Sequence, residues 1–210
     1  MAERRRVLSI DGGGIRGIIP AMFLAELERR TQRPVSELFD LIAGTSTGGI
    51  LALGLTVPGP DGRPRYRAQD LVALYELEGG EIFSRSAWHR IRALGNVAEE
   101  KYPSRGIETV LERRFGESRL SEALADVLIP SYEIERRMPF FFRSSRARVR
   151  PDYDFRMRDV ARATSAAPTY FEPHKIPADE DGRDYYALID GGVYANNPAM
   201  CAYAEAQTTA

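Results

Sequence analysis

One serine of this chain stands in a pattern that is typical of a catalytic nucleophile. The pattern comprises Gly44, Thr45, Ser46, Thr47 and Gly48. Small residues two positions either side of the serine permit a strained turn between a strand and a helix, which exposes the hydroxyl near the helix N-terminus. A chain of this composition contains roughly 0.09 such patterns by chance, so a second signal is needed. The pattern predicts that Ser46 attacks an acyl carbonyl.

A glycine-rich loop lies near the N-terminus, between an expected strand and an expected helix. It has the form G-x-G-x-x-G and comprises Gly12, Gly13, Gly14, Ile15, Arg16 and Gly17. In dinucleotide-binding proteins such a loop holds a pyrophosphate, and an acidic residue about 20 positions on, at the end of the second strand, binds the ribose. Asp40 stands near that distance but precedes its strand, and no Gly-Lys-Ser or Gly-Lys-Thr follows as a Walker phosphate loop requires. The alternative is that the backbone N–H groups stabilise an oxyanion during acyl transfer, with the Arg16 cation beside them.

A serine hydroxyl needs a base to accept its proton, and the two histidines are poorly placed for that role. They are His89 and His174. Where a hydrolase of this kind uses a histidine, it follows the acid in the chain, and no histidine follows Tyr185 here. We expect His174, in a proline-bounded loop, to have a surface or packing role, and we expect the same of His89.

Asp190 is the better candidate for the base. It ends an expected strand over residues 185–189 and is followed at once by Gly191 and Gly192. The glycines let the loop turn sharply and leave room for a substrate, although a plain Asp-Gly turn explains the same residues. An aspartate in water is far too weak a base for serine, so Asp190 would act only if it were partly desolvated and hydrogen-bonded to the hydroxyl.

Taken in order, these motifs resemble those of the patatin-like phospholipases, and in particular the bacterial-type lipid acyl hydrolases of that family. The three motifs are Asp11-Gly12-Gly13-Gly14-Ile15-Arg16-Gly17, Gly44-Thr45-Ser46-Thr47-Gly48-Gly49 and Asp190-Gly191-Gly192. The likeness also extends through residues 161–171, which begin Ala-Arg-Ala-Thr-Ser-Ala-Ala-Pro, and through Asn196-Asn197-Pro198. It therefore spans nearly the whole chain.

The resemblance implies a three-layer α/β/α fold with a mostly parallel central sheet. It also implies a Ser-Asp dyad in which Ser46 is the nucleophile and Asp190 the general base, while residues 12–17 form the oxyanion hole with Arg16 close by. The implied reaction is of the phospholipase A type. It cleaves fatty acyl esters of phospholipids or related lipids through an acyl-Ser46 intermediate, without a metal or another cofactor.

The elements that would position these residues follow from hydrophobic periodicity and from the glycines and prolines between them. Strands are expected over residues 7–10, 41–43, 127–134, 140–143 and 185–189. Helices are expected over residues 18–30, from 50, 68–78, 106–115, 155–164 and from 197, with residues 68–125 mostly helical. Two successive units of strand, turn and helix predict a parallel sheet. We expect one domain over residues 1–210, which lacks C-terminal elements that would close the sheet.

Composition restricts the partners. The chain has 210 residues, 43% of them hydrophobic, and a formal net charge of −1, so it has no basic field of the kind that gathers nucleic acid. Its single cysteine, Cys201, excludes an internal disulfide and a cysteine-rich zinc site. No signal peptide is visible, and the most apolar later stretch, residues 50–57, is far too short to cross a bilayer. We therefore expect a cytoplasmic protein that contacts the membrane, if at all, from its surface.

A candidate for such contact is Phe140-Phe141-Phe142, which is followed by Arg143, Arg146, Arg148 and Arg150. The favoured interpretation of these residues is a buried strand followed by a solvated loop. Two alternatives to the hydrolase stay open at this point. The first is a nucleotide-binding module of the Rossmann type, and the second is a regulator on the same fold, either catalytically silent or activated by a second messenger.

Overall fold

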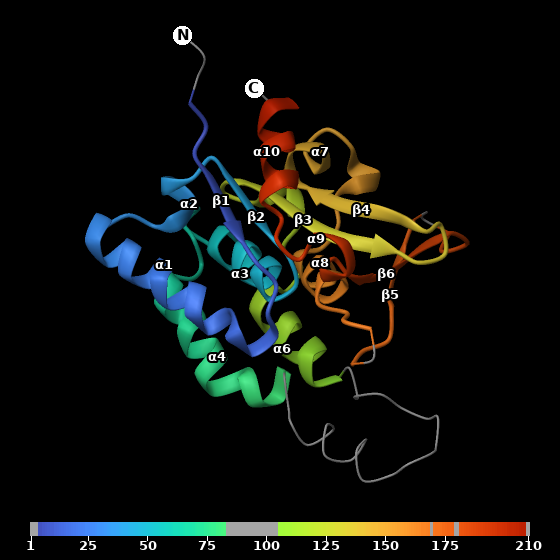
Figure 1. Ribbon diagram of the computed structural model, residues 1–210, viewed down its shortest axis with the longest axis horizontal. Coiled ribbons are helices and arrows are strands. Elements are labelled where there is room, and N and C mark those ends of the chain that lie inside the picture. The colour runs from blue at the N-terminus through green and yellow to red at the C-terminus, as the bar shows by residue number, and fades with distance from the viewer. Residues whose placement is uncertain (1–3, 83–104, 169, 179–180, 209–210) are drawn as a thin grey trace.

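The computed structural model describes residues 4–82, 105–168, 170–178 and 181–208 (Figure 1). The middle of the stretch predicted as mostly helical, residues 83–104 with His89, lies outside the described residues.

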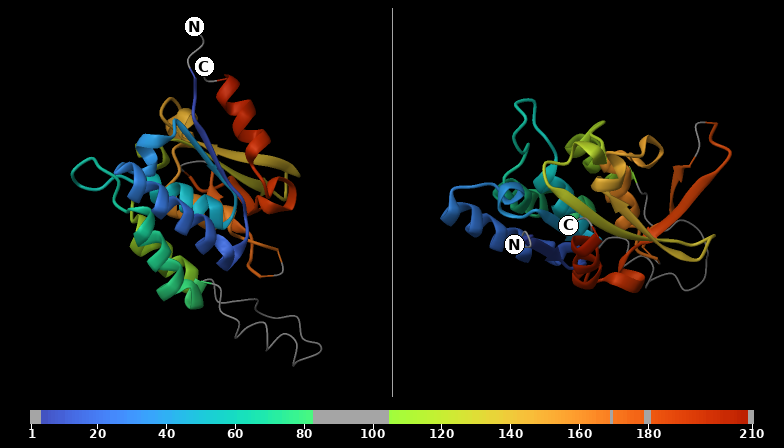
Figure 2. Two further views of the ribbon diagram at one scale, coloured as in Figure 1. Left: turned by 60° about the vertical axis from the view of Figure 1, so that its left-hand side comes forward. Right: turned by 90° about the horizontal axis from the view of Figure 1, so that it is seen from above.

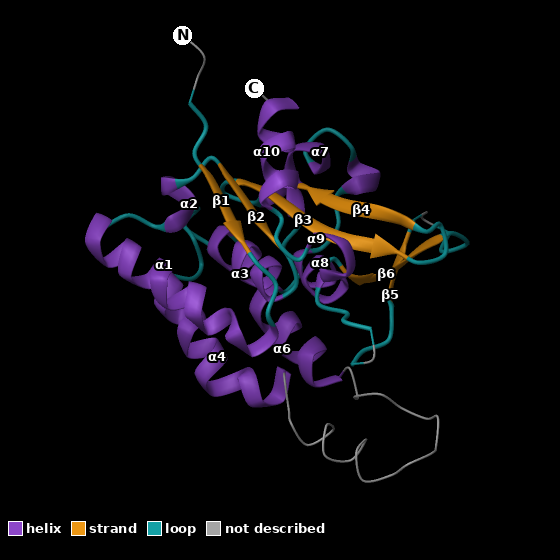
Figure 3. Cartoon of the chain, in the orientation of Figure 1, coloured by secondary structure: helices purple, strands orange, loops and turns teal. Residues whose placement is uncertain are grey.

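A six-stranded sheet runs through the centre of the described fold, with helices on both sides (Figures 1 and 3). The strands are β1 (Val7–Ile10), β2 (Leu41–Gly44), β3 (Asp126–Glu133), β4 (Met138–Arg143), β5 (His174–Pro177) and β6 (Tyr185–Asp190). β1, β2 and β3 pair in parallel, whereas β4 and β6 pair antiparallel to β3, and β5 pairs antiparallel to β6. The sheet is mixed, and β1, β2, β3 and β5 share one direction.

Strand β3 brings the ends of two distant strands together. β2 pairs with its first part, Asp126 to Leu128, and β6 pairs with its last part, Ser131 to Glu133. Both lie on the same edge of β3, because β4 occupies the other edge. β2 runs parallel to β3 and β6 runs antiparallel, so their carboxyl ends approach each other beside Pro130.

The described residues form nine α-helices and three short 3-10 helices. The α-helices are α1 (Ile18–Thr31), α2 (Val35–Leu38), α3 (Thr47–Thr56), α4 (Ala68–Ile82), α6 (Arg105–Phe115), α7 (Ser144–Ala147), α8 (Met157–Thr164), α9 (Gly192–Ala195) and α10 (Ala199–Thr208). Short 3-10 helices occur at η1 (Gly14–Gly17), η2 (Leu120–Glu122) and η3 (Pro151–Tyr153).

The alternation of side chains along the strands produces three layers. Successive residues of a strand point to opposite faces. Ile42 and Ile129 belong to the large core beneath α1, α3, α4, α6 and α8, while Leu41, Ala43 and Leu128 pack against α10 on the other face. Figure 2 shows α10 on one side of the sheet and the N-terminal helices on the other. The three-layer α/β/α architecture that the family resemblance implies is confirmed.

Helix α3 follows the predicted nucleophile directly and is buried on every side. All of its residues from Thr47 to Thr56 are buried, as a helix of uniformly apolar sequence requires. It begins at Thr47 rather than at the predicted residue 50, because Gly48 and Gly49 are weak helix formers whose place in the first turn is fixed by packing.

The expectation of a loop at His174 was wrong. His174 begins β5, which lies at the edge of the described sheet. All four residues of β5, His-Lys-Ile-Pro, pair with β6. Proline at Pro173 and Pro177 argued against a strand, but an edge strand tolerates proline because one of its sides needs no ladder hydrogen bonds.

The aromatic and basic segment is folded into the protein. Phe140 and Phe142 are buried, as expected of a buried strand, and Phe140 packs against the rings of Tyr153 and Phe155. The segment after it was expected to be a solvated loop. Arg148 and Arg150 are exposed as expected, but two short helices stand in place of the loop. α7 and η3 form there, Arg146 lies over the Tyr153 ring, and Arg148 pairs with Asp126 at 2.5 Å.

Among the helices of the described ranges, none is long and apolar enough to span a bilayer.

Candidate active site

Ser46 occupies the turn between β2 and α3 and has a strained backbone. Its φ and ψ are 55° and −123°, a conformation that is uncommon for a residue other than glycine. The turn is held tightly against β1, since a Cβ atom added at Gly48 would collide with the carbonyl of Ile10. Gly44 ends β2 and packs against Gly48 from the other side. The strained turn that the serine motif predicts is therefore present.

Ser46 and Asp190 lie in direct contact. The Ser46 Oγ donates a hydrogen bond of 2.6 Å to Asp190 Oδ2. The other carboxylate oxygen, Oδ1, accepts 2.7 Å from the N–H of Gly192, and the carboxylate stands at the end of β6 where Gly191 turns the chain. Two residues separated by 144 positions are thus brought together by the meeting of β2 and β6 beside β3.

Burial determines the electrostatics of Asp190. The residue is only 6% exposed, and loss of water around its carboxylate raises its pKa above the ordinary value of an aspartate. The hydrogen bonds from Ser46 and Gly192 act in the opposite direction but are the smaller causes. An aspartate in this state is a stronger base, once ionised, than an aspartate in water.

Thr164 fixes the turn at Ser46 from the side of α8. The N–H of Ser46 donates 3.0 Å to Thr164 Oγ1, which itself donates 2.7 Å to the carbonyl of Pro130. Pro130 is the residue beside which β2 and β6 meet, so one hydroxyl joins β3 to the serine. The site prediction did not include Thr164, although it falls within the segment 161–171 that carries the family resemblance.

The two threonines of the serine motif hold the turn from within. Thr45 Oγ1 donates 2.7 Å to the carbonyl of Ala195, which ties the turn to α9. Thr47 Oγ1 is hydrogen-bonded to the hydroxyl of Tyr75 on α4, beside Gly17 at the end of η1. Both threonine side chains are buried and have hydrogen-bond partners.

The glycine loop lies against the serine. A Cβ atom at Gly12 would stand 3.3 Å from the Ser46 Cβ and would collide with the side chain of Asn196. The Gly12 N–H is already used, because it donates 3.0 Å to the carbonyl of Asn196. In the part of the chain that the structure describes, the N–H groups of Gly13 and Gly14 have no acceptor. Both of these N–H groups are therefore free to bind a ligand.

Arg16 contacts its own loop. Its Nε lies 3.4 Å from the carbonyl of Gly13, and the side chain is exposed. No described carboxylate forms an ion pair with it. The loop is further fixed by the segment after α9, because Asn196 Nδ2 lies 3.4 Å from the carbonyl of Gly12 and Asn197 Nδ2 lies 3.3 Å from Asp11 Oδ2. Asn196 was also missing from the predicted site.

The alternative base and the alternative ribose ligand both lie elsewhere. His174 Nε2 lies 3.3 Å from Asp159 Oδ1 on α8, and neither Ser46 nor Asp190 is among its hydrogen-bond partners. Asp40 precedes β2 and binds Arg6 through both oxygens, the shorter contact to the side chain being 2.9 Å. Because β1 and β2 are parallel, Asp40 stands at the opposite end of the sheet from the glycine loop. This geometry does not support a Rossmann-type nucleotide site.

The fold and the motifs define a family. The family model described as "Patatin-like phospholipase" matches residues 8–203, and the chain belongs to this family. Patatin-like protein 4 of Arabidopsis thaliana is 40% identical over 92% of this chain and 50% of the relative. A potato (Solanum tuberosum) relative, 37% identical over 95% of this chain and 54% of its own, is named "Probable inactive patatin-3-Kuras 1". The chain spans about half the length of the curated relatives it matches.

A solved structure shares the fold. The crystal structure of VipD from Legionella pneumophila matches with a TM-score of 0.52 at 14% identity, over 91% of this chain and 46% of that one. Membership of the patatin-like phospholipase family is evidence for lipid acyl hydrolysis at the level of the family. One relative is named as probably inactive, so membership alone does not establish activity.

Proposed function

We propose that this chain is a serine lipid acyl hydrolase that cleaves fatty acyl esters of phospholipids or related lipids. The single observation that carries the proposal is the 2.6 Å hydrogen bond from Ser46 to a buried carboxylate, on a strained turn in a member of the patatin-like family. A strained turn, a desolvated acceptor and two free backbone donors together are the requirements of acyl transfer without histidine.

In the first half of the reaction, the Ser46 Oγ attacks the ester carbonyl carbon while its proton passes to Asp190 Oδ2. The negative charge that develops on the carbonyl oxygen is stabilised by the N–H groups of Gly13 and Gly14, each of which is worth about 10²–10³ in rate in comparable oxyanion holes. Asp190 then gives the proton to the departing alcohol, and the acyl group stays on Ser46.

In the second half, water takes the place of the alcohol. Asp190 accepts a proton from the water while the water oxygen attacks the acyl carbon. The bond between the acyl carbon and the Ser46 Oγ then breaks. The proton returns to the Ser46 Oγ and the fatty acid is released. Each proton moves over the one hydrogen-bonded contact between Asp190 and the reacting oxygen, so the mechanism needs no third residue.

The test is release of fatty acid from phospholipid vesicles by the wild-type protein and by Ser46→Ala. We expect turnover by the wild type and a loss of at least about 10³-fold in the variant. Turnover that persists in a folded Ser46→Ala protein would refute the mechanism. A wild-type protein that folds, belongs to the family and cleaves no ester would instead support the alternative of a silent or activated regulator.

A further inference from the structure

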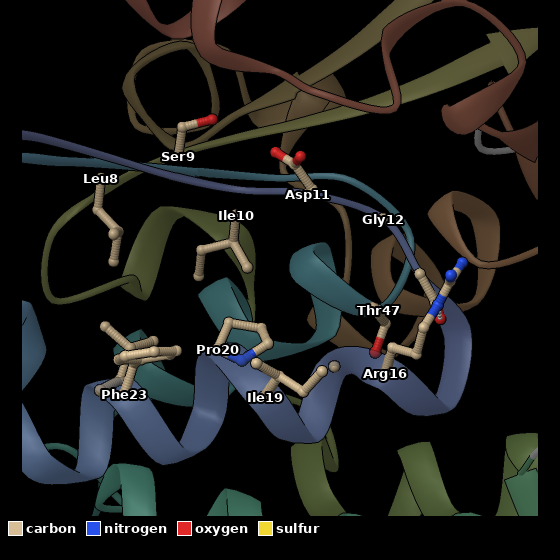
Figure 4. A pocket seen from close by; sticks show the side chains of 13 residues that line it. Leu8, Ser9, Ile10, Asp11, Gly12, Arg16, Ile19, Pro20, Phe23 and Thr47 are labelled. Carbon is tan, nitrogen blue, oxygen red and sulfur yellow. Dashed lines mark hydrogen bonds between the residues drawn. The ribbon is translucent and has the colours of Figure 1, made fainter.

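An apolar groove begins at the glycine loop and runs away from it between β1 and α1 (Figure 4). Its volume is about 400 Å³, which lies within the range of small-molecule sites in proteins. Strand β1 forms one wall and, among the described strands, is the end of the sheet, so the groove opens along that edge.

Alternation along β1 makes this wall apolar. Leu8 and Ile10 point toward α1, whereas Ser9 and Asp11 point the other way, as Figure 4 shows. From Leu8 to Gly12 an extended chain covers about 13 Å, which sets the length of the wall.

The opposite wall is one face of α1. Ile19 and Phe23 are four residues apart and therefore lie above one another on the helix surface, and Pro20 stands beside Ile19 (Figure 4). Phe23 is 73% exposed and Ile19 is 53% exposed, so both present apolar surface to the groove and to water. Covering such surface with hydrocarbon removes it from water and is therefore favourable.

The polar side chains that face into the groove gather at one end of it. Gly12, Gly13, Arg16 and Thr47 line it there, and Gly12 is the residue that packs against the Cβ of Ser46. The same end carries the free N–H group of Gly13. A ligand that fits has a polar group at the glycine loop and a hydrocarbon tail along β1 and α1.

We infer that this groove binds the acyl chain of the lipid ester, with the ester carbonyl at the glycine loop beside Ser46. The inference rests on the proposed function, and it assigns chain-length selection to Leu8, Ile10, Ile19 and Phe23. These residues touch the tail and not the reacting atoms, so they control which acyl group is cleaved.

The first test uses Ile19→Trp, which fills the middle of the groove, and Met22→Trp as its matched control. Met22 is on the same helix and is 58% exposed, but it does not line the groove. We expect Ile19→Trp to lower the ratio of kcat/KM for p-nitrophenyl decanoate to that for p-nitrophenyl butyrate by about 10-fold. Met22→Trp should keep the wild-type ratio, and an unchanged ratio in Ile19→Trp would overturn the inference.

A second variant and a second measurement keep the two proposals separate. Phe23→Ala, at the far end, should lower the same ratio by several-fold, and it serves if Ile19→Trp does not fold. Binding of decanoate to Ser46→Ala protein, followed by calorimetry, needs no catalysis. We expect it to weaken about 10-fold when Ile19→Trp is added and not when Met22→Trp is added. If the protein binds decanoate but cleaves no ester, the proposed function is refuted and the groove assignment stands. If it cleaves esters and neither Ile19→Trp nor Phe23→Ala changes the ratio, the groove assignment is refuted and the proposed function stands.

Discussion

Two serine–aspartate pairs in this protein have similar hydrogen bonds and different surroundings. Ser46 Oγ donates to Asp190 Oδ2 at 2.6 Å, and Ser121 Oγ donates to Asp154 Oδ2 at 2.8 Å. The N–H of Ser121 also donates to Asp154, at 2.9 Å, so one carboxylate receives both groups of a residue in the short helix η2. This is how a side chain caps a turn.

At Ser46 the backbone N–H and the side-chain hydroxyl have separate hydrogen-bond partners. Its N–H is bound by Thr164, its hydroxyl alone faces Asp190, and its backbone has a positive φ. Asp190 is buried, while Asp154 and Ser121 are both partly exposed. The comparison teaches that a short serine–carboxylate hydrogen bond is not specific to the proposed nucleophile. The strained turn, the burial and the free donors of the glycine loop distinguish the first pair from the second.

The largest expected difference between the two pairs is the loss of ester turnover when the aspartate is replaced by asparagine. Asp190→Asn leaves an oxygen that can accept from Gly192 but cannot take a proton from Ser46, so we expect ester turnover to fall by about 10³-fold or more. Asp154→Asn should leave turnover close to wild type because it only loosens a cap. Initial rates on a soluble ester measure both, and equal losses in the two variants would contradict the assignment.

The next effect concerns the glycine loop. In Gly12→Ala the new methyl group would collide with the Asn196 side chain and press on Ser46, so the loop must move. We expect kcat to fall by about 10²-fold, as when an oxyanion donor is misplaced. Gly13→Ala is the control, since its Cβ would meet nothing closer than the Arg16 side chain at 3.7 Å and its φ is 177°. A larger loss in Gly13→Ala than in Gly12→Ala would show that the loop is not positioned as we describe.

A smaller effect is expected at Thr164, which positions the serine without touching substrate. Thr164→Val removes the hydroxyl that joins Ser46 N–H to the Pro130 carbonyl, and kcat should fall about 10-fold with little change in KM. Thr164→Ser restores the hydroxyl and should restore most of kcat. If serine fails to rescue kcat, the methyl packing of Thr164 matters and not its hydrogen bonds.

The smallest effect is on stability and depends on pH. Because burial raises the pKa of Asp190, the folded state loses stability as pH rises from below the ordinary aspartate value, about 3.9, through the raised value. Asp190→Asn lacks this loss, so its melting temperature should exceed that of the wild type at pH 7. The difference should shrink as pH falls below about 4, where the wild-type carboxyl is protonated in both states. Melting curves at both pH values decide this, and a less stable Asp190→Asn at pH 7 would contradict it.

In the proposed mechanism, the same raised pKa of Asp190 also controls the rate. Asp190 accepts a proton only when ionised, so kcat/KM should decline as pH falls, at a pH above the ordinary aspartate range.

The sequence predicts much of this arrangement, and the reasons for its failures are physical. Hydrophobic periodicity and glycine spacing locate β1, β2, α1 and the serine turn, since these features depend on neighbours in the chain. The opposite direction of β6 and the strand at His174 depend on pairing with distant segments. Thr164 and Asn196 act through hydrogen bonds to residues 118 and 184 positions away, which no local pattern specifies.

The most direct measurement of the central claim is reaction of the protein with a fluorophosphonate probe, followed by mass spectrometry of the modified peptide. We predict that the phosphonyl group is found on Ser46 and not on Ser121, that Ser121→Ala is labelled as the wild type is, and that Asp190→Asn is labelled far more slowly. Labelling that is absent from Ser46, or that is equal at Ser46 and Ser121, would contradict the account.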